Sequence, residues 1–413
     1  MTTISEHQKS KKWADLVFWA GFIALLTIHC IENTSLTYYT PDWLTTLYLI
    51  RNLLYLVLLG KIFFLSTYRV GELWAILGIL FTAGLCFLCS DDFTLMEFAI
   101  IAIAAKDAPK RQLLSVFLLI KSASVVLTLL LWDLEVLPEL YYIHHDLPLD
   151  TMGFCHRNVL GSNMAVLCLS WLYLRFRRLH WGDLVACLLM TVVTYFLAVS
   201  RSSLVIMVGS TFLVLLMKLL EPKLKAFPHT GKLLGGAFLM LLLVSLLGSL
   251  FYEEGVPLWD TMDDFLTGRL SFANECYRQH GFTLLGQQIP FVSTMESSLS
   301  GSYRLVLDNS FVRVLIYDGL LPGSLFLTLY LVCLLRAWRK GDTALATCFL
   351  VIGIYGVSES FMLDVFYCFP LLLGCVDLFR RSPADETWKP LAYARKLFAP
   401  FFLWIRDRMG AKK

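Results

Sequence analysis

Six arginines lie at or just below one end of the apolar segments of this chain, and no lysine accompanies them there. They are Arg157, Arg201, Arg269, Arg278, Arg304 and Arg313. A guanidinium presents a planar fork of N–H donors that binds a phosphate through two parallel hydrogen bonds, and it stays charged at any physiological pH. The arginines therefore predict recognition of a phosphate-bearing ligand. The alternative is that they only contact lipid headgroups and aromatic side chains at a membrane surface.

Other polar groups enter the apolar segments from the same end, in four separated parts of the sequence. They are His156, Arg157 and Asn158; Ser200, Arg201 and Ser202; Asp308, Asn309, Ser310 and Arg313; and Glu359 with Asp364. Such groups are costly in a membrane unless they are paired or hydrated, so each is a candidate for function. The alternative for Asp308, Ser200 and Ser310 is that they cap helix N-termini. Capping explains Arg157 and Arg201 less well, because an arginine at a helix N-terminus opposes the helix dipole.

The composition indicates that the elements positioning these groups are membrane spans. The chain has 413 residues, of which 57% are hydrophobic and 16% are charged, whereas about a quarter of the residues in a soluble domain are charged. This difference excludes a soluble globular enzyme, a disordered chain and a disulfide scaffold. The net charge of +3 gives no reason to expect a nucleic-acid partner. Most of the 11 cysteines lie in apolar runs without metal-binding spacing, and a bridge between Cys155 and Cys276 is left open.

The apolar runs predict an all-α polytopic membrane protein with about twelve transmembrane helices, because a helix needs about 20 apolar residues to cross a bilayer. The expected spans cover residues 13–31, 43–65, 72–89, 92–105, 112–132, 153–174, 181–199, 203–220, 232–251, 309–335, 343–361 and 364–379. The fourth run is short and carries Glu97, so the alternative for the third and fourth runs is a re-entrant pair. Residues 1–380 are expected to form one transmembrane domain.

The distribution of basic residues predicts the orientation. Lys and Arg mark cytoplasmic loops, and most of the 35 basic residues fall in alternate connections on one side of the membrane. Both termini are therefore expected in the cytoplasm, and the six arginines on the extracytoplasmic side. The first span lacks a cleavage site and is expected to stay attached. Residues 381–413 alternate basic and apolar-aromatic residues, which predicts an amphipathic helix on the inner leaflet.

Two extracytoplasmic loops are long. Residues 133–152 contain several acidic residues, no lysine or arginine, and the pair His144–His145. A solvated loop is favoured there over a metal site formed with Asp146, because adjacent histidine side chains diverge, and no metal is expected. Residues 252–308 are the longest polar segment, and apolar residues at helical spacing predict a helix over 269–280. A loop of this length is expected to fold over the membrane surface and to be functional.

The polar residues form short motifs in a fixed order. The motifs are GFCHRN from Gly153, SRS at Ser200–Ser202, TGRL at Thr267–Leu270, LLGQ at Leu284–Gln287, DNSF at Asp308–Phe311, DGLLPG at Asp318–Gly323 and SES at Ser358–Ser360. In their order and spacing around one long loop they resemble the O-antigen polymerase and O-antigen ligase family. The resemblance is nearer to the Wzy-type polymerases of bacterial capsular and exopolysaccharide clusters, and it covers roughly residues 90–370.

The resemblance implies a GT-C-like membrane glycosyltransferase with one long extracytoplasmic loop. Such an enzyme acts at the outer face of the bacterial cytoplasmic membrane, on saccharides linked to undecaprenyl pyrophosphate. It inverts the anomeric carbon and uses no metal or other cofactor. A polymerase transfers the growing chain onto the next lipid-linked repeat unit, in capsule, exopolysaccharide or O-antigen biosynthesis. Membrane lipid, a chain-length regulator and a flippase are the candidate partners.

The resemblance also assigns roles to individual residues. Arg201 and Arg269 match the family's pyrophosphate-binding arginines, while Asp308–Asn309 lies where the ligases usually carry His-Asn. This substitution favours polymerase over ligase and leaves the catalytic base open among Asp308, then His156 and Glu359. The expected substrate-binding residues are Arg201, Arg269, Arg157, Arg278, Arg304, Asn158, Asn309 and Arg313. The alternatives are a ligase-type glycosyltransferase, a lipid-linked sugar flippase or transporter, for which charged residues at mid-membrane are expected, and a membrane scaffold without activity.

Overall fold

The apolar runs identified in the sequence are largely helical in the computed structural model of the chain, which describes residues 2–39, 41–144, 147–379 and 387–388. Nine helices in this part of the chain are long and apolar enough to cross a membrane. They are α1 (Thr2–Glu32), α3 (Pro41–Gly60, continued by a π-helical turn over Lys61–Leu65), α4 (Val70–Ser90), α6 (Lys110–Asp133), α7 (Arg157–Arg175, followed by a 3-10 turn over Phe176–Arg178), α8 (Trp181–Ala198), α9 (Arg201–Ala226), α10 (Thr230–Leu250) and α15 (Leu320–Arg339).

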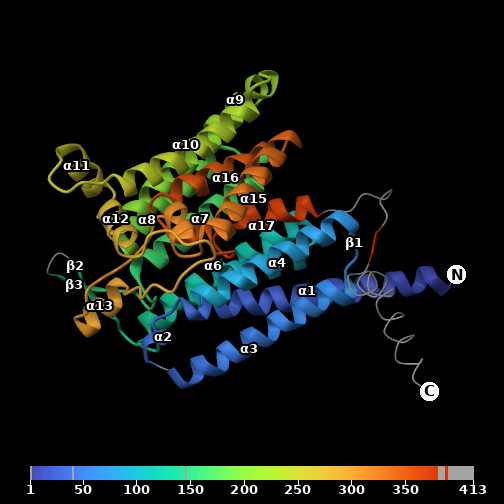
Figure 1. The fold of residues 1–413 in the computed structure, drawn as a ribbon, viewed down its shortest axis with the longest axis horizontal. Helices are drawn as coiled ribbons and strands as arrows, with labels where there is room; N and C mark the ends of the chain where they lie inside the picture. The colour runs from blue at the N-terminus through green and yellow to red at the C-terminus, as the bar shows by residue number, and fades with distance from the viewer. Residues whose placement is uncertain (1, 40, 145–146, 380–386, 389–413) are drawn as a thin grey trace, which may run out of the picture.

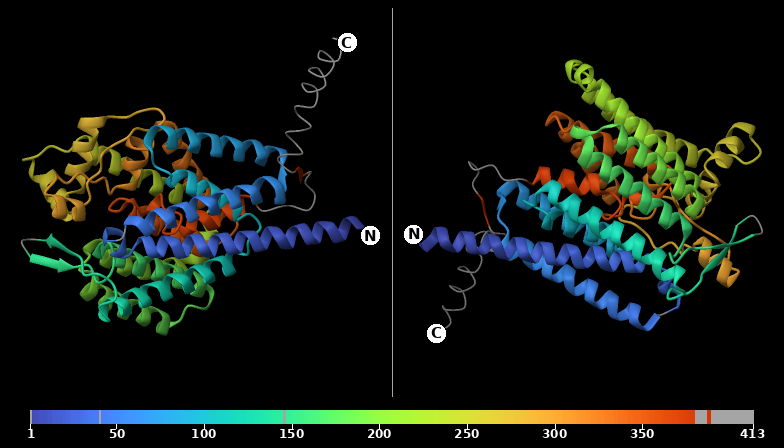
Figure 2. Two further views of the ribbon diagram at one scale, coloured as in Figure 1. Left: turned by 90° about the horizontal axis from the view of Figure 1, so that it is seen from below. Right: turned by 180° about the vertical axis from the view of Figure 1, so that it is seen from behind.

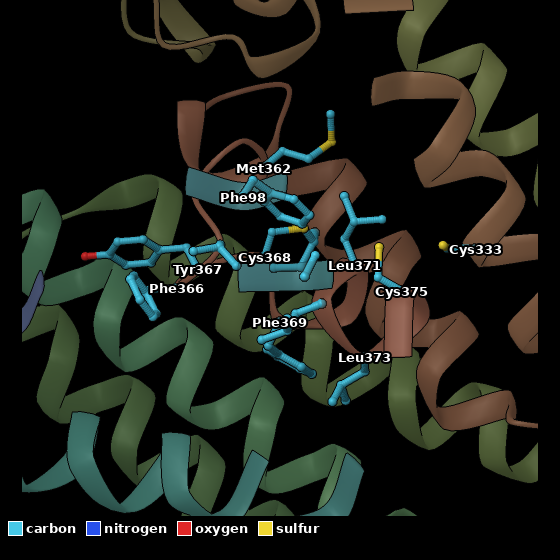
Figure 3. Close-up of a cluster of buried hydrophobic side chains, with 14 of the residues drawn as sticks. Phe98, Cys333, Met362, Phe366, Tyr367, Cys368, Phe369, Leu371, Leu373 and Cys375 are labelled. Carbon is cyan, nitrogen blue, oxygen red and sulfur yellow. The ribbon is translucent and has the colours of Figure 1, made fainter. Parts of the chain in front are cut away.

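Three shorter apolar helices occupy the places of the fourth, eleventh and twelfth expected spans. They are α5 (Thr94–Ala104), α16 (Thr343–Tyr355) and α17 (Phe369–Leu378). Their side chains are mostly buried, as expected for helices that are apolar all round. Figure 3 shows Leu371 and Cys375 of α17 in a buried cluster with Phe98 of α5 and Cys333 of α15. The count of twelve crossings stays a prediction, because these helices are shorter than a bilayer requires.

The outward faces of the long helices expose large apolar side chains. Leu56 of α3 is 63% exposed, Leu119 of α6 is 70% exposed and Phe196 of α8 is 72% exposed. Apolar surface of this extent is unfavourable in water and is expected against lipid. Together with the nine long apolar helices, it identifies an all-α polytopic membrane protein.

The short polar-rich elements gather at the end of the molecule opposite the N-terminus, which we call the loop end (Figures 1 and 2). They are α2 (Leu36–Tyr39), the antiparallel hairpin of β2 (Tyr141–His144) and β3 (Leu147–Asp150), α11 (Pro257–Phe265), α12 (Arg269–His280) and α13 (Thr294–Ser300). Helix α12 confirms the helix predicted over 269–280. A second strand pair joins β1 (Tyr68–Arg69) to β4 (Thr387–Trp388); the rest of the predicted amphipathic tail lies outside the described residues.

The expected span 309–335 is broken into two helices. Helix α14 (Ser310–Ile316) ends before the left-handed Gly319, where α15 begins. The backbone of the long loop fills the break: Leu320 N–H donates to Thr283 O at 2.8 Å and Gln287 N–H donates to Tyr317 O at 3.0 Å. The two motifs LLGQ and DGLLPG therefore form one structural unit. A β-carbon on Gly319 would lie 2.2 Å from the backbone nitrogen of Gly286, so only glycine fits there.

Candidate functional site

Arg269 is the centre of a polar cluster at the loop end. It is the first residue of α12, a helix whose N-terminal N–H groups are bound by the carboxylate of Asp263. Its NH2 group donates to Glu359 Oε1 at 2.7 Å, and its Nε donates to the Ser358 carbonyl. The NH1 group donates to the Leu266 carbonyl at 3.0 Å. The guanidinium is thus fixed in place before any ligand binds.

Glu359 joins three segments that are far apart in the sequence. It lies in the turn between α16 and α17, is 4% exposed, and accepts a hydrogen bond of 2.7 Å from Ser202 Oγ as well as that from Arg269. Its carbonyl accepts from Ser310 Oγ at 2.5 Å. Burial raises the pKa of Glu359 to about 7, although the positive charge of Arg269 opposes this shift. The carboxylate therefore orients Arg269 and the N-terminus of α9.

Asp308 is the more accessible carboxylate of the cluster. Its side chain is 29% exposed and its Oδ2 lies 3.9 Å from Arg269 Nε. The neighbouring Asn309 is the N-cap of α14, where its Oδ1 accepts from Phe311 N–H at 3.0 Å and from Val312 N–H at 3.3 Å. The capping alternative for Asp308 is therefore wrong, because Asn309 performs that function. Asp308 is left free to interact with a ligand.

Two further arginines flank this cluster with unused donors. The guanidinium of Arg304 lies over the ring of Phe272 at 4.8 Å, and its buried Nε has no hydrogen-bond partner among the described residues. The pKa of Arg304 is lowered, mainly by burial and also by the positive charge of Arg269. The negative charge of Asp308 partly opposes this shift. Arg201 begins α9 beside Ser202 and is exposed, and its side chain forms no hydrogen bond or ion pair with the described part of the chain. Both arginines remain available to an anion.

The other predicted residues are engaged elsewhere. Buried Arg157 donates from Nε to the Asp150 carbonyl of the hairpin, and His156 caps α7 through a 3.0 Å hydrogen bond that its Nδ1 accepts from Asn158 N–H. Asn158 is half-buried in the first turn of α7, with its backbone N–H used in this cap. The His156 ring stacks on Tyr142 at 4.5 Å. These contacts join α7 to the hairpin and do not bring His156 into the Arg269 cluster.

Arg313 and Arg278 also lie apart from the cluster. Arg313 forms an ion pair of 3.4 Å with Asp92 and lies over the rings of Phe291 and Tyr317, 5.2 Å from each. Arg278 is exposed near the end of α12. Of the predicted residues, the structure therefore brings Arg269, Asp308 and Glu359 into contact.

The sequence reasoning missed a buried hydroxyl network behind Glu359. Tyr355 OH shares hydrogen bonds with Ser162 Oγ at 2.7 Å and with Ser203 Oγ at 3.3 Å. Ser203 N–H donates to Ser200 Oγ, which caps α9 as the sequence alternative proposed. Hydroxyls inside apolar helices, such as Ser162, were the available signal. The network links α7, α9 and α16 beneath the site.

An apolar groove of about 450 Å³ runs between α6 and α8 over α7. Its floor is one face of α7, formed by Leu160, Met164, Leu167 and Trp171. Its lining includes Leu197, four residues before Arg201 in the sequence. The groove therefore places apolar surface beside the arginine at the start of α9.

Two further sequence expectations concern a disulfide bond and a metal site. Cys155 and Cys276 are both free, and Cys276 is buried in α12, so the bridge left open does not form. Among the described residues, no group of three His, Cys, Asp or Glu side chains is arranged to hold a metal ion. The side chains of His144, His145 and Asp146 lie outside the described residues.

Fold and site together define the class: an all-α polytopic membrane protein with an arginine–carboxylate cluster at its loop end. Comparisons with protein-family models, with curated proteins and with solved structures find no match for this chain.

Proposed function

We propose that this protein is a polysaccharide polymerase that joins undecaprenyl-pyrophosphate-linked repeat units at the outer face of the bacterial cytoplasmic membrane. The observation that carries the proposal is the Arg269–Glu359–Asp308 cluster, flanked by Arg201 and Arg304 with unused donors. Preorganised arginines stabilise the negative charge that develops on a departing pyrophosphate. The apolar groove beside α9 suits the polyisoprenoid chain of such a substrate.

The proposed reaction is a single inverting displacement. A hydroxyl of the incoming repeat unit attacks the anomeric carbon of the lipid-linked chain, and the bond from that carbon to the phosphate oxygen breaks. Asp308 accepts the hydroxyl proton, which a partly exposed carboxylate then releases to solvent. Arg201, Arg269 and Arg304 bind the pyrophosphate that leaves. Glu359 is better suited to hold Arg269 than to act as the base, because it is 4% exposed, whereas the side chain of Asp308 is 29% exposed.

The substitution of Asp308–Asn309 for the ligases' His-Asn supports a polymerase over a ligase. Saccharide analysis of a strain lacking this gene tests the proposal, with complementation by wild type, Arg201→Ala or Asp308→Ala. The expected result is loss of long polymer and accumulation of single lipid-linked repeat units on the outer face, with both variants resembling the deletion. Long polymer that forms but stays on its lipid carrier would favour the ligase.

A flippase or transporter is the second candidate, because charged side chains lie inside the helix bundle. Lys121 of α6 has no exposed surface, Tyr55 OH donates to Glu97 of α5 at 2.5 Å, and Arg51 forms an ion pair of 2.8 Å with Glu32. Intramembrane charges of this kind are frequent in transport pathways. In the same deletion strain, repeat units trapped facing the cytoplasm would support this candidate and contradict the polymerase.

A further inference from the structure

The turn between α16 and α17, residues 356–368, carries two acidic side chains with different partners. Glu359 holds Arg269, as described above. Asp364 accepts a hydrogen bond of 2.7 Å from Phe366 N–H through Oδ1, and its Oδ2 lies 3.8 Å from His29 Nε2 of α1. The turn therefore connects the arginine–carboxylate cluster to a second polar cluster between α1, α6 and α7.

Lys121 is the buried cation of this second cluster. Its Nζ donates to Asn163 Oδ1 of α7 at 2.8 Å and lies 3.7 Å from the centre of the Tyr367 ring. Its positive charge also acts on Asp364 and on His29. A lysine with its whole side chain buried among helices needs an opposite charge nearby, and Asp364 supplies one.

A continuous set of packed rings joins Lys121 to the site. The Tyr367 ring lies 4.4 Å from that of Phe361, which lies 6.0 Å from that of Tyr355. The hydroxyl of Tyr355 is held by Ser162 and Ser203, next to Ser202 and its bond to Glu359. Close-packed groups resist deformation, so these rings offer a physical connection from Tyr367, which Lys121 contacts, to the site.

We propose that Lys121 is a positioning residue: anchored on Asn163, it packs on the Tyr367 ring and balances the charge of Asp364, so that it clamps the turn 356–368 and sets where Glu359 holds Arg269. The effect on polymer rests on the proposed function, whereas the position of the turn does not. Removing Lys121 alone leaves Asp364 as an uncompensated charge. Removing both charges relieves the imbalance, so the paired variant recovers the position of the turn.

The test measures the accessibility of the turn directly. Ser358→Cys is introduced into a chain carrying Cys89→Ser and Cys155→Ser, and its modification by a polar maleimide is timed in the detergent-purified protein, where the orientation of the turn in the membrane does not matter. Lys121→Met and Asp364→Asn are each expected to accelerate labelling about tenfold, and the double variant to return it to the wild-type rate. Lys61→Met is the matched control, because that lysine is equally buried but donates to the Ala104 carbonyl, away from the turn.

The outcomes separate the two proposals. Unchanged labelling in Lys121→Met, or equal acceleration in Lys61→Met, overturns the positioning role. Where Lys121→Met fails to insert, recovery of insertion and of slow labelling in the double variant supports the role, and failure to recover overturns it. Polymer measured in the same strains should decrease wherever labelling accelerates and should recover in the double variant. A deletion strain with normal polymer would overturn the polymerase and leave the labelling result standing.

Discussion

The Glu359→Gln variant offers a quantitative test of the buried carboxylate. Glutamine keeps the shape of the side chain and its acceptor oxygen, so the contacts from Ser202 and Arg269 survive while the ionisable group is lost. Burial raises the pKa of Glu359 to about 7, above the 4.5 of an ordinary glutamic acid. The protonated form is therefore favoured by folding.

This shift fixes the sign and the size of a pH effect on stability. The stabilisation from proton binding at Glu359 is fully present below pH 4.5 and disappears as the pH rises through about 7. Between pH 5 and pH 8 the wild-type protein is expected to lose about 2–3 kcal/mol of unfolding free energy through the titration of Glu359 beside Arg269 and Asp308. The Glu359→Gln variant lacks that component, so its stability should depend less on pH by this amount.

Thermal unfolding of the detergent-purified protein, followed by tryptophan fluorescence at pH 5 and pH 8, measures the difference. Glu254→Gln is the matched control, because Glu254 is exposed and its replacement should leave the pH dependence of the wild type unchanged. The reasoning is refuted if wild type and Glu359→Gln respond to pH alike. That result would mean that Glu359 is solvated in the folded protein.

Three further expectations concern single residues. Arg201→Ala should abolish long polymer while the midpoint of thermal unfolding stays within a degree or two of wild type, because its exposed side chain supports no other residue. Gly319→Ala should destabilise the protein by about 1–3 kcal/mol or more in the same unfolding assay, because the Gly319 backbone has a positive φ and a β-carbon there would collide with the backbone of Gly286. Gly78→Ala, where a β-carbon meets open space, should leave the stability unchanged. Asn309→Ala should cost about 1 kcal/mol as a lost helix cap, and Asp308→Ala should instead remove polymer at unchanged stability; the reverse pattern would contradict the assignment of the two residues.

Local sequence signals predicted the helices well, and the reason is that lipid-facing and buried faces are both apolar. The runs over 13–31 and 112–132 lie within α1 and α6, and the spacing over 269–280 matches α12. The break at Tyr317–Gly319 was not predicted, because the residues on both sides of it are apolar and read as one span. Only the contact with Thr283–Gln287, supplied by a distant loop, makes the break visible.

The site was predicted as a set of residues but not as a set of contacts. Arg269 and Glu359 were both candidates, yet their pairing joins positions 90 residues apart and follows from the packing of α12 against the α16–α17 turn. His156 and Arg157 looked equally suitable by type and by position. Their side chains are bound by the hairpin and by a helix cap, which no residue pattern revealed.

The adjacent residues Asp308 and Asn309 show why residue type alone does not decide function here. Both residue types are favourable at the N-cap, so from the sequence either one could bind the first N–H groups of α14. Asn309 takes that position and has 2% of its surface exposed, while Asp308, one residue earlier, stays 29% exposed beside Arg269. The amide of Asn309 caps α14, and the carboxylate of Asp308 is therefore available for other interactions beside two arginines. A polar residue at a membrane helix end becomes a candidate for chemistry when its neighbour already satisfies the helix.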